Sequence, residues 1–71
     1  MMKSLLLTIN GKNINLALEK QTVTGLLQNL QINPAGVIIE HNKSLYKNPD
    51  FDHIHLTPND SVEILHFMGG G

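Results

Sequence analysis

The sequence ends in Met68-Gly69-Gly70-Gly71, four residues whose chemistry differs from that of the rest of the chain. Glycine lacks a Cβ, so a segment of glycines is costly to order yet thin enough to enter a narrow cleft. The terminal carboxylate of Gly71 is therefore suited to be a reacting group that another protein's active site receives. The competing interpretation is a frayed end without a function, because termini are often disordered. The rest of the sequence has to decide between these two interpretations.

The other candidate sites in the sequence lack companion residues. His53 and His55 are spaced to share one face of a strand, but two histidines without further ligands do not predict a metal site. Asp50 and Asp52 lie in a segment where aspartates typically form turns. The chain has no cysteine, and no glycine-rich loop followed by Lys and Ser or Thr that would hold a nucleotide. We therefore expect no catalytic residue, no metal and no bound cofactor, in a protein that is not an enzyme.

The length and charge of the chain exclude several classes of function. A chain of 71 residues forms one small domain, in which a deep catalytic pocket would consume most of the core. A net charge of −1 with 15% charged residues leaves no basic surface for nucleic acid. No apolar run approaches the length of a membrane span, and the N-terminal segment is too short for a signal peptide. We expect a cytoplasmic protein that binds neither nucleic acid nor membrane.

A β-hairpin is predicted near the N-terminus. Two segments alternate apolar and other residues with the period of a strand. Asn10-Gly11 between them is typical of a tight type I′ turn, because both residues tolerate positive φ. The apolar residues that would share one face of this hairpin are Leu5, Leu7, Ile9, Ile14, Leu16 and Leu18. That face has to be covered by another element.

The element predicted to pack on the apolar face of the hairpin is a helix that begins after Thr22, a favourable N-cap residue. Its apolar stripe, at spacings of three and four residues, consists of Val23, Leu26, Leu27 and Leu30. Gly25 lies inside it at a cost of about 1 kcal/mol relative to Ala, which we attribute to a close approach of the helix to the sheet. Pro34 prevents the helix from extending further, so we expect a length of about ten residues.

Further extended segments are predicted after the helix. Residues 37–41 and 61–67 alternate as strands, and residues 45–46 form a very short one. Turns are expected at 42–44 and 58–60, and a loop or helical turn at 47–52 lets Phe51 close the end of the core. This order predicts an α+β domain at 1–67, a β-grasp (ubiquitin-like) mixed sheet of four to five strands with one main helix across one face. The last strand would lie in the centre, parallel to the first, and carry a flexible tail at 68–71.

With this arrangement the sequence resembles the ThiS family of sulfur carrier proteins over its whole length. The resemblance is carried by Ile9-Asn10-Gly11-Lys12, Thr22-Val23 with Leu26-Leu27, the segments 37–42 and 60–64, and the ending 66–71. It implies that a ThiF-like enzyme uses ATP to adenylate the Gly71 carboxylate. A sulfur donor such as a cysteine desulfurase then converts the adenylate to a thiocarboxylate, and a ThiG-like thiazole synthase takes the sulfur for thiamine biosynthesis.

The resemblance also ranks the three glycines of the tail. A Cβ on Gly70 or Gly71 would collide with a channel built for bare backbone, so both residues are expected to be essential. The place of Gly69 can hold another small residue in the family.

A carrier also needs a surface that its partner enzymes recognise. If the last strand lies between the first and the third, Leu6, Ile38, Leu65 and Phe67 would be exposed neighbours on the sheet face away from the helix. A contiguous exposed apolar patch usually marks an interaction site. We predict that these four residues, with Met68 leading into the tail, dock the adenylating enzyme and the thiazole synthase.

Two alternatives from other classes stay open at the level of the sequence. Carriers that supply sulfur to molybdopterin or to tRNA thiolation also end in Gly-Gly, because specificity resides in the docking surface rather than in the tail. A ubiquitin-like protein modifier would use the same tail to form isopeptide bonds with lysines. The fate of the terminal carboxylate separates the carrier from the modifier.

Overall fold

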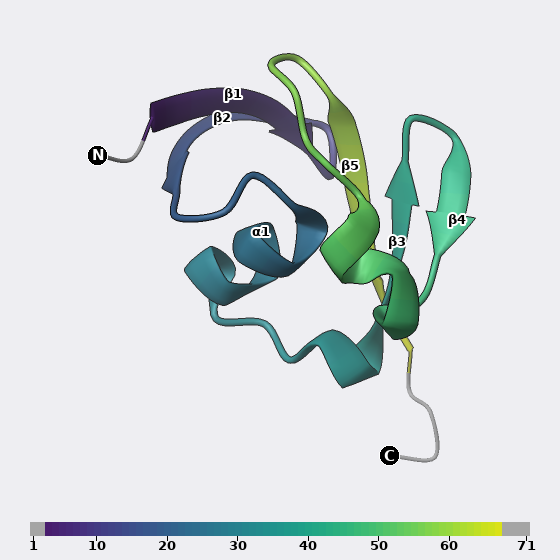
Figure 1. The fold of residues 1–71 in the computed structure, drawn as a ribbon. Helices are drawn as coiled ribbons and strands as arrows, with labels where there is room; N and C mark the ends of the chain where they lie inside the picture. The colour runs from purple at the N-terminus through teal and green to yellow at the C-terminus, as the bar shows by residue number, and fades with distance from the viewer. Residues whose placement is uncertain (1–2, 68–71) are drawn as a thin grey trace.

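The computed structural model describes residues 3–67, so the predicted tail at 68–71 lies outside the described residues. The strands are β1 (Lys3–Ile9), β2 (Lys12–Leu18), β3 (Val37–His41), β4 (Ser44–Tyr46) and β5 (Ser61–His66) (Figure 1). The α-helix is α1 (Val23–Leu30), and two short 3-10 helices follow it, η1 (Pro34–Gly36) and η2 (Asn48–His53).

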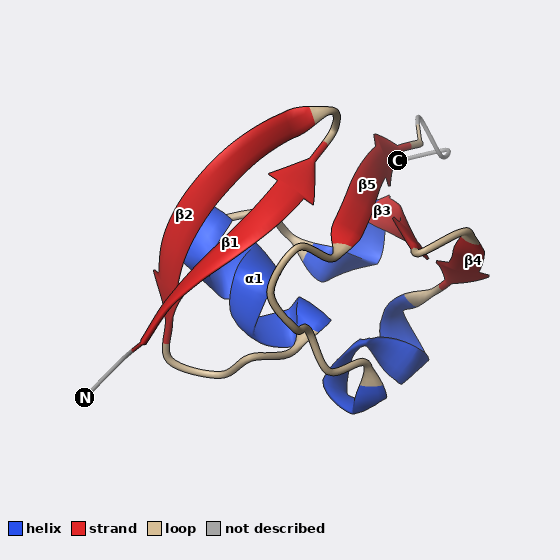
Figure 2. Cartoon of the chain, turned by 90° about the horizontal axis from the view of Figure 1, so that it is seen from above, coloured by secondary structure: helices blue, strands red, loops and turns tan. Residues whose placement is uncertain are grey.

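The five strands form one mixed sheet in the order β2-β1-β5-β3-β4, which Figure 2 shows from above. The last strand, β5, pairs in parallel with β1 and antiparallel with β3. Helix α1 and the 3-10 helices lie on the concave side of this sheet (Figure 1). The predicted two-layer α+β architecture, with its central last strand parallel to the first, is confirmed.

Both hairpins turn through residues with positive φ. Asn10 and Gly11 have φ values of 49° and 83°, and Ile9 pairs with Lys12, so the first turn has two residues, as predicted. The second turn is also two residues long, because Asn42 and Lys43 have φ values of 48° and 78° and His41 pairs with Ser44. Lysine is an uncommon residue in this left-handed region. Ser44, expected in the turn, is the first residue of β4.

Helix α1 begins as predicted but is shorter than expected. The Thr22 hydroxyl accepts a hydrogen bond from the Gly25 backbone N–H at 3.1 Å, which caps the first turn. The helix has eight residues rather than about ten, because Gln31 adopts a left-handed conformation with φ 59° and ends it before Pro34. The predicted reason for Gly25 is wrong. A Cβ at this position would meet the carbonyl of Lys20, in the loop that leads into the helix, and not the sheet.

The core lies between the sheet and the helical layer. Alternate residues of β1, β3 and β5 point into it, together with the apolar stripe of α1 and Phe51 from η2. The buried apolar residues are Leu5, Leu7, Ile9, Leu18, Val23, Leu26, Leu27, Val37, Ile39, Phe51, Ile54, Leu56, Val62 and Ile64. Phe51 is only 1% exposed, which confirms its predicted place in the core. Within residues 3–67, no helix combines the length and apolarity that crossing a membrane requires.

Candidate functional site

The candidate site begins where the central strand ends. Strand β5 finishes at His66, and the Phe67 backbone N–H still donates to the Gly36 carbonyl at 3.3 Å. Val37 pairs with His66, so this end of β5 lies beside the start of β3 and away from the β3–β4 turn (Figure 1). The chain therefore leaves the sheet from its middle strand, which is a supported point of departure for the residues that follow.

The β1 strand supports only the first part of β5. Their parallel register consists of Thr8 opposite Ser61 and Ile9 opposite Val62. Beyond the end of β1, the side chain of Asn10 continues the contact with β5. Its Oδ1 accepts a hydrogen bond from the Ile64 backbone N–H at 2.7 Å. The turn residue that closes the first hairpin thus also fixes the strand that leads to the tail.

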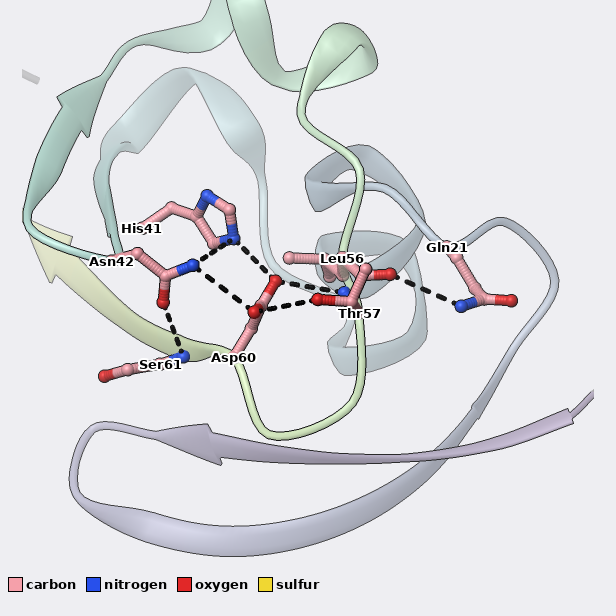
Figure 3. Close-up of polar contacts among 7 residues, drawn as sticks. All are labelled: Gln21, His41, Asn42, Leu56, Thr57, Asp60 and Ser61. Atoms are coloured by element: carbon pink, nitrogen blue, oxygen red, sulfur yellow. Dashed lines mark hydrogen bonds and ion pairs between the residues drawn. The ribbon is translucent and has the colours of Figure 1, made fainter.

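A polar cluster holds the other end of β5 (Figure 3). The Asp60 carboxylate lies 2.8 Å from His41 Nε2 and accepts a hydrogen bond from the Thr57 backbone N–H at 3.0 Å. Asn42 Nδ2 donates to Asp60 Oδ1 at 3.3 Å, and Asn42 Oδ1 accepts from the Ser61 backbone N–H at 3.0 Å. The cluster ties the β3–β4 turn to the segment that enters β5.

These contacts change the acidity of Asp60. Partial burial by itself raises the pKa of this carboxyl, but the hydrogen bonds from His41, Thr57 and Asn42 outweigh it and lower the pKa from 3.8 to about 2. The carboxylate is therefore charged over the physiological range and acts as a fixed acceptor. The sequence did not predict this cluster, because His41 and Asp60 are 19 residues apart and nothing in the segments 37–42 and 60–64 indicates that their side chains meet.

The predicted docking patch is split in the structure. Ile38 and Leu65 face each other across β3 and β5, and Phe67 follows on the same face; Leu65 and Phe67 are 43% and 47% exposed. Leu6 is 40% exposed, but its carbonyl accepts from the Asn59 backbone N–H, so it lies level with residue 59. From Leu6 it is two residue steps along β1 to Thr8, which pairs with Ser61, and four more along β5 to Leu65, a distance of about 20 Å.

The expectation that Leu6 is a neighbour of the other three residues is therefore wrong. The alternation of residues along β1 correctly assigned Leu6 to the outer face of the sheet. Its position along the strand direction depends on the register between β1 and β5, which only the structure shows. We define the exit patch as Ile38, Leu65 and Phe67; its docking role stays a prediction. Met68, Gly69, Gly70 and Gly71 lie outside the described residues.

An apolar hollow of about 430 Å³ borders the exit patch. Its walls come from η1, the start of β3 and the start of η2, and Ile38 and Phe67 belong to both the hollow and the patch. The lining residues are Pro34, Ala35, Val37, Ile38, Lys47, Asn48, Pro49 and Phe67. The sequence analysis missed this hollow. The available signal was a proline at the start of each 3-10 helix, which exposes an apolar ring without a backbone donor.

The weaker candidates of the sequence analysis do not gather into a site. Asp52, His53 and His55 are exposed on η2 and the segment after it. Among residues 3–67 there is no group of three or more His, Cys, Asp or Glu side chains that could hold a metal ion.

Comparison with known proteins gives one consistent family. The sequence model of the ThiS family matches residues 6–71. The sulfur carrier protein ThiS of Bacillus subtilis (strain 168) is 33% identical over 66 residues, which cover 93% of this chain and all of that protein. The crystal structure of the thiamine biosynthesis protein ThiS from Geobacter metallireducens superposes with a TM-score of 0.75 at 36% identity, covering 94% of this chain and 100% of that one.

A third relative is much longer than this chain. The thiazole synthase of Magnetococcus marinus (strain ATCC BAA-1437 / JCM 17883 / MC-1) is 35% identical over 63 residues, which cover 89% of this chain but only 19% of that protein. Sheet order, helix and central last strand define a β-grasp domain, and the solved ThiS structure has the same fold. The chain belongs to the ThiS family.

Proposed function

We propose that this chain is a sulfur carrier of thiamine biosynthesis whose sulfur is bound at the Gly71 carboxylate. The main support is family membership over residues 6–71, which includes the tail, together with similarity to the whole of the sulfur carrier ThiS of Bacillus subtilis. The fold adds a physical reason, because the last described strand is central and is held by side-chain contacts at its start, Ser61, and further along, at Ile64.

The proposed chemistry is carried out by partner enzymes. A carboxylate is a poor electrophile, because its charge is delocalised and oxide is a poor leaving group. A ThiF-like enzyme would use ATP to place AMP on the Gly71 carboxylate and release pyrophosphate. A sulfur donor, such as a cysteine desulfurase, would then supply the sulfur that displaces AMP and leaves a thiocarboxylate. This chain acts as a carried co-substrate rather than as an enzyme.

Thiazole synthase is the proposed acceptor of the sulfur. In the Magnetococcus marinus thiazole synthase, a segment similar to this chain occurs within the polypeptide of the synthase itself. Covalent linkage of a carrier segment and a synthase raises their effective concentration, which favours transfer of a group from the carrier to the synthase. The ThiF-like enzyme and the sulfur donor are inferred from the family alone.

The exit patch and the adjoining hollow are the proposed docking surface. Ile38, Leu65 and Phe67 expose apolar area directly beside the point where the chain leaves β5. Gly71 is the fourth residue after Phe67, a distance of at most about 14 Å along the chain, so an active site that holds Gly71 has to contact this end of the sheet. Leu6, about 20 Å away along the strands, lies outside the contact that this geometry requires.

The intact mass of the protein from its native cell tests the proposal. We expect a fraction whose mass exceeds that of the unmodified chain by one sulfur-for-oxygen exchange, located in the C-terminal peptide. Gly71→Ala and Gly70→Ala should lose this fraction while keeping the wild-type melting temperature. Gly69→Ala is the matched control and should retain it.

Two outcomes would contradict the proposal. A covalent adduct between Gly71 and a protein lysine would indicate a protein modifier. A deletion strain that grows without thiamine, but lacks molybdopterin or thiolated tRNA, would indicate a carrier for another route.

A further inference from the structure

Two glutamates lie opposite each other in the centre of the exposed sheet face. Glu40 of β3 pairs with Glu63 of β5 in the antiparallel register. Their neighbours Ile39, Val62 and Ile64 are buried on the inner face, so both carboxylates point to the outer face. Directly opposed side chains on one face have Cβ atoms about 4.5–5.5 Å apart, and like charges at that separation destabilise the pair.

Within the described part of the chain, no cationic side chain forms an ion pair with Glu40 or Glu63. The ion pair found between residues 3 and 67 is His41–Asp60, on the inner side of the turn. Lys43 lines the same outer hollow of about 410 Å³ as Glu40 and Glu63, but its ammonium is more than 4.0 Å from both carboxylates. The free protein therefore presents two adjacent carboxylates on its outer sheet face without a direct ion-pair partner among the described residues.

The glutamate pair adjoins the exit patch. Ile38 and Leu65 form the neighbouring outer pair of the same two strands, two residues along, which is about 7 Å. Phe67 follows one further step towards the tail. The outer face of β3 and β5 is thus apolar next to the tail and acidic beyond it. An enzyme that covers the apolar part would also approach Glu40 and Glu63.

We propose that the outer face of β3 and β5 docks thiazole synthase, with a basic side chain of the enzyme against Glu40 and Glu63 and its apolar side chains on the exit patch. The inference rests on the proposed function, and it names the charge that the enzyme surface must carry. A guanidinium can donate hydrogen bonds to both carboxylates through its planar set of N–H groups. Complementary charge beside an apolar contact fixes orientation and accelerates association.

The opposed glutamates predict a combination of effects that a merely structural pair would not show. Replacing them removes repulsion in the free protein, so stability should stay equal or rise. It also removes the negative charges that attract the enzyme's basic side chain, so affinity should fall. A pair that served the fold would give the reverse sign for stability.

The test is titration calorimetry with thiazole synthase from the same genome. We expect the double variant Glu40→Gln/Glu63→Gln to bind about tenfold more weakly than the wild type at low salt. The wild-type affinity should fall as salt rises, and that dependence should flatten in the double variant. Glu19→Gln removes one carboxylate charge, half of what the double variant removes, from an exposed site after β2 and serves as the control, with wild-type affinity expected. Melting temperatures of all variants should equal or exceed that of the wild type.

The outcomes separate this inference from the function on which it depends. If wild-type protein shows no affinity for thiazole synthase, the proposed function itself loses its acceptor. If the wild type binds and the double variant binds equally well with the same salt dependence, only the acidic docking contact is overturned. An equal loss for Glu19→Gln would also overturn it, because the effect would then come from net charge.

Discussion

At the scale of single residues, Gly25 differs from Gly11 and Gly36, because it is the one of these three at which an added Cβ would meet other atoms within 4 Å. Its neighbour is the carbonyl of Lys20, which belongs to the loop that folds back against the start of α1. A backbone carbonyl cannot move aside as the end of a flexible side chain can. The absence of a Cβ at Gly25 therefore allows the short connection from β2 to α1, and the low helix propensity of glycine is tolerated for that reason.

We predict that Gly25→Ala destabilises the protein although alanine is the better helix former. The clash with Lys20 should lower the free energy of unfolding by about 2 kcal/mol, and the melting temperature by roughly 10 °C for a domain of this size. Gly36→Ala is the control, because a Cβ there meets no atom within 4 Å. Thermal denaturation followed by circular dichroism measures both. Equal melting temperatures for the two variants would refute the packing argument.

At the scale of elements, the pairing between β1 and β5 involves few residues, although it positions the strand that leads to the tail. The register contains two residue pairs, and the rest of the connection comes from backbone contacts at its ends and from the side chain of Asn10. Asn10 thus performs two tasks, since its backbone turns the hairpin and its amide oxygen continues the pairing of β5. Both tasks position the strand from which the tail leaves.

The two tasks of Asn10 can be separated by substitution. Asn10→Gly keeps the left-handed turn but removes the acceptor of the Ile64 N–H, so stability should fall by about 1 kcal/mol. Asn10→Asp keeps both the turn and an acceptor oxygen and should stay close to wild type. Hydrogen exchange of the Ile64 amide gives a local reading, and it should be faster in the Gly variant alone. Unchanged protection there would show that the contact is dispensable.

At the scale of the whole molecule, the residues that support β5 come from segments far apart in the chain. Asp60 is held by His41 and Asn42 from the β3–β4 turn, and its own segment precedes β5. These contacts close only when the β3–β4 turn and the segment at 57–60 are brought together. The acidity of Asp60 therefore reports a tertiary contact between two segments rather than the state of one element.

The pH dependence of stability should report this coupling. Because the pKa of Asp60 is about 2 when folded and near 3.8 when unfolded, its contribution is complete above about pH 4 and is lost as pH falls towards 2. We expect Asp60→Asn to be about 1 kcal/mol less stable than wild type at about pH 6, a value reduced by solvent screening, and the two to converge near pH 2. Urea denaturation at both pH values measures the difference. Parallel pH curves would contradict the assignment.

The sequence by itself determined the local features of this protein. Alternation in β1, β3 and β5 assigned each residue to the inner or the outer face, Asn10-Gly11 determined the first turn, and Thr22 the start of α1. These features depend on contacts between residues close in the chain, so their signal survives in a single sequence. The β-grasp order followed from the same local elements and was confirmed, as was membership of the ThiS family.

Only the tertiary structure decided how distant residues meet. Leu6 is separated from Leu65, Gly25 contacts Lys20 rather than the sheet, and Glu40 faces Glu63 because of the registers and loop path of the folded chain. The period of a strand shows which face of the sheet a side chain lies on, but not which residue of the neighbouring strand lies beside it. A change of register by two residues leaves every side chain on the same face. The register is set by hydrogen bonds and core packing between segments far apart in sequence. For this reason, the arrangement of surface residues near the end of β5 could not be predicted from the sequence alone.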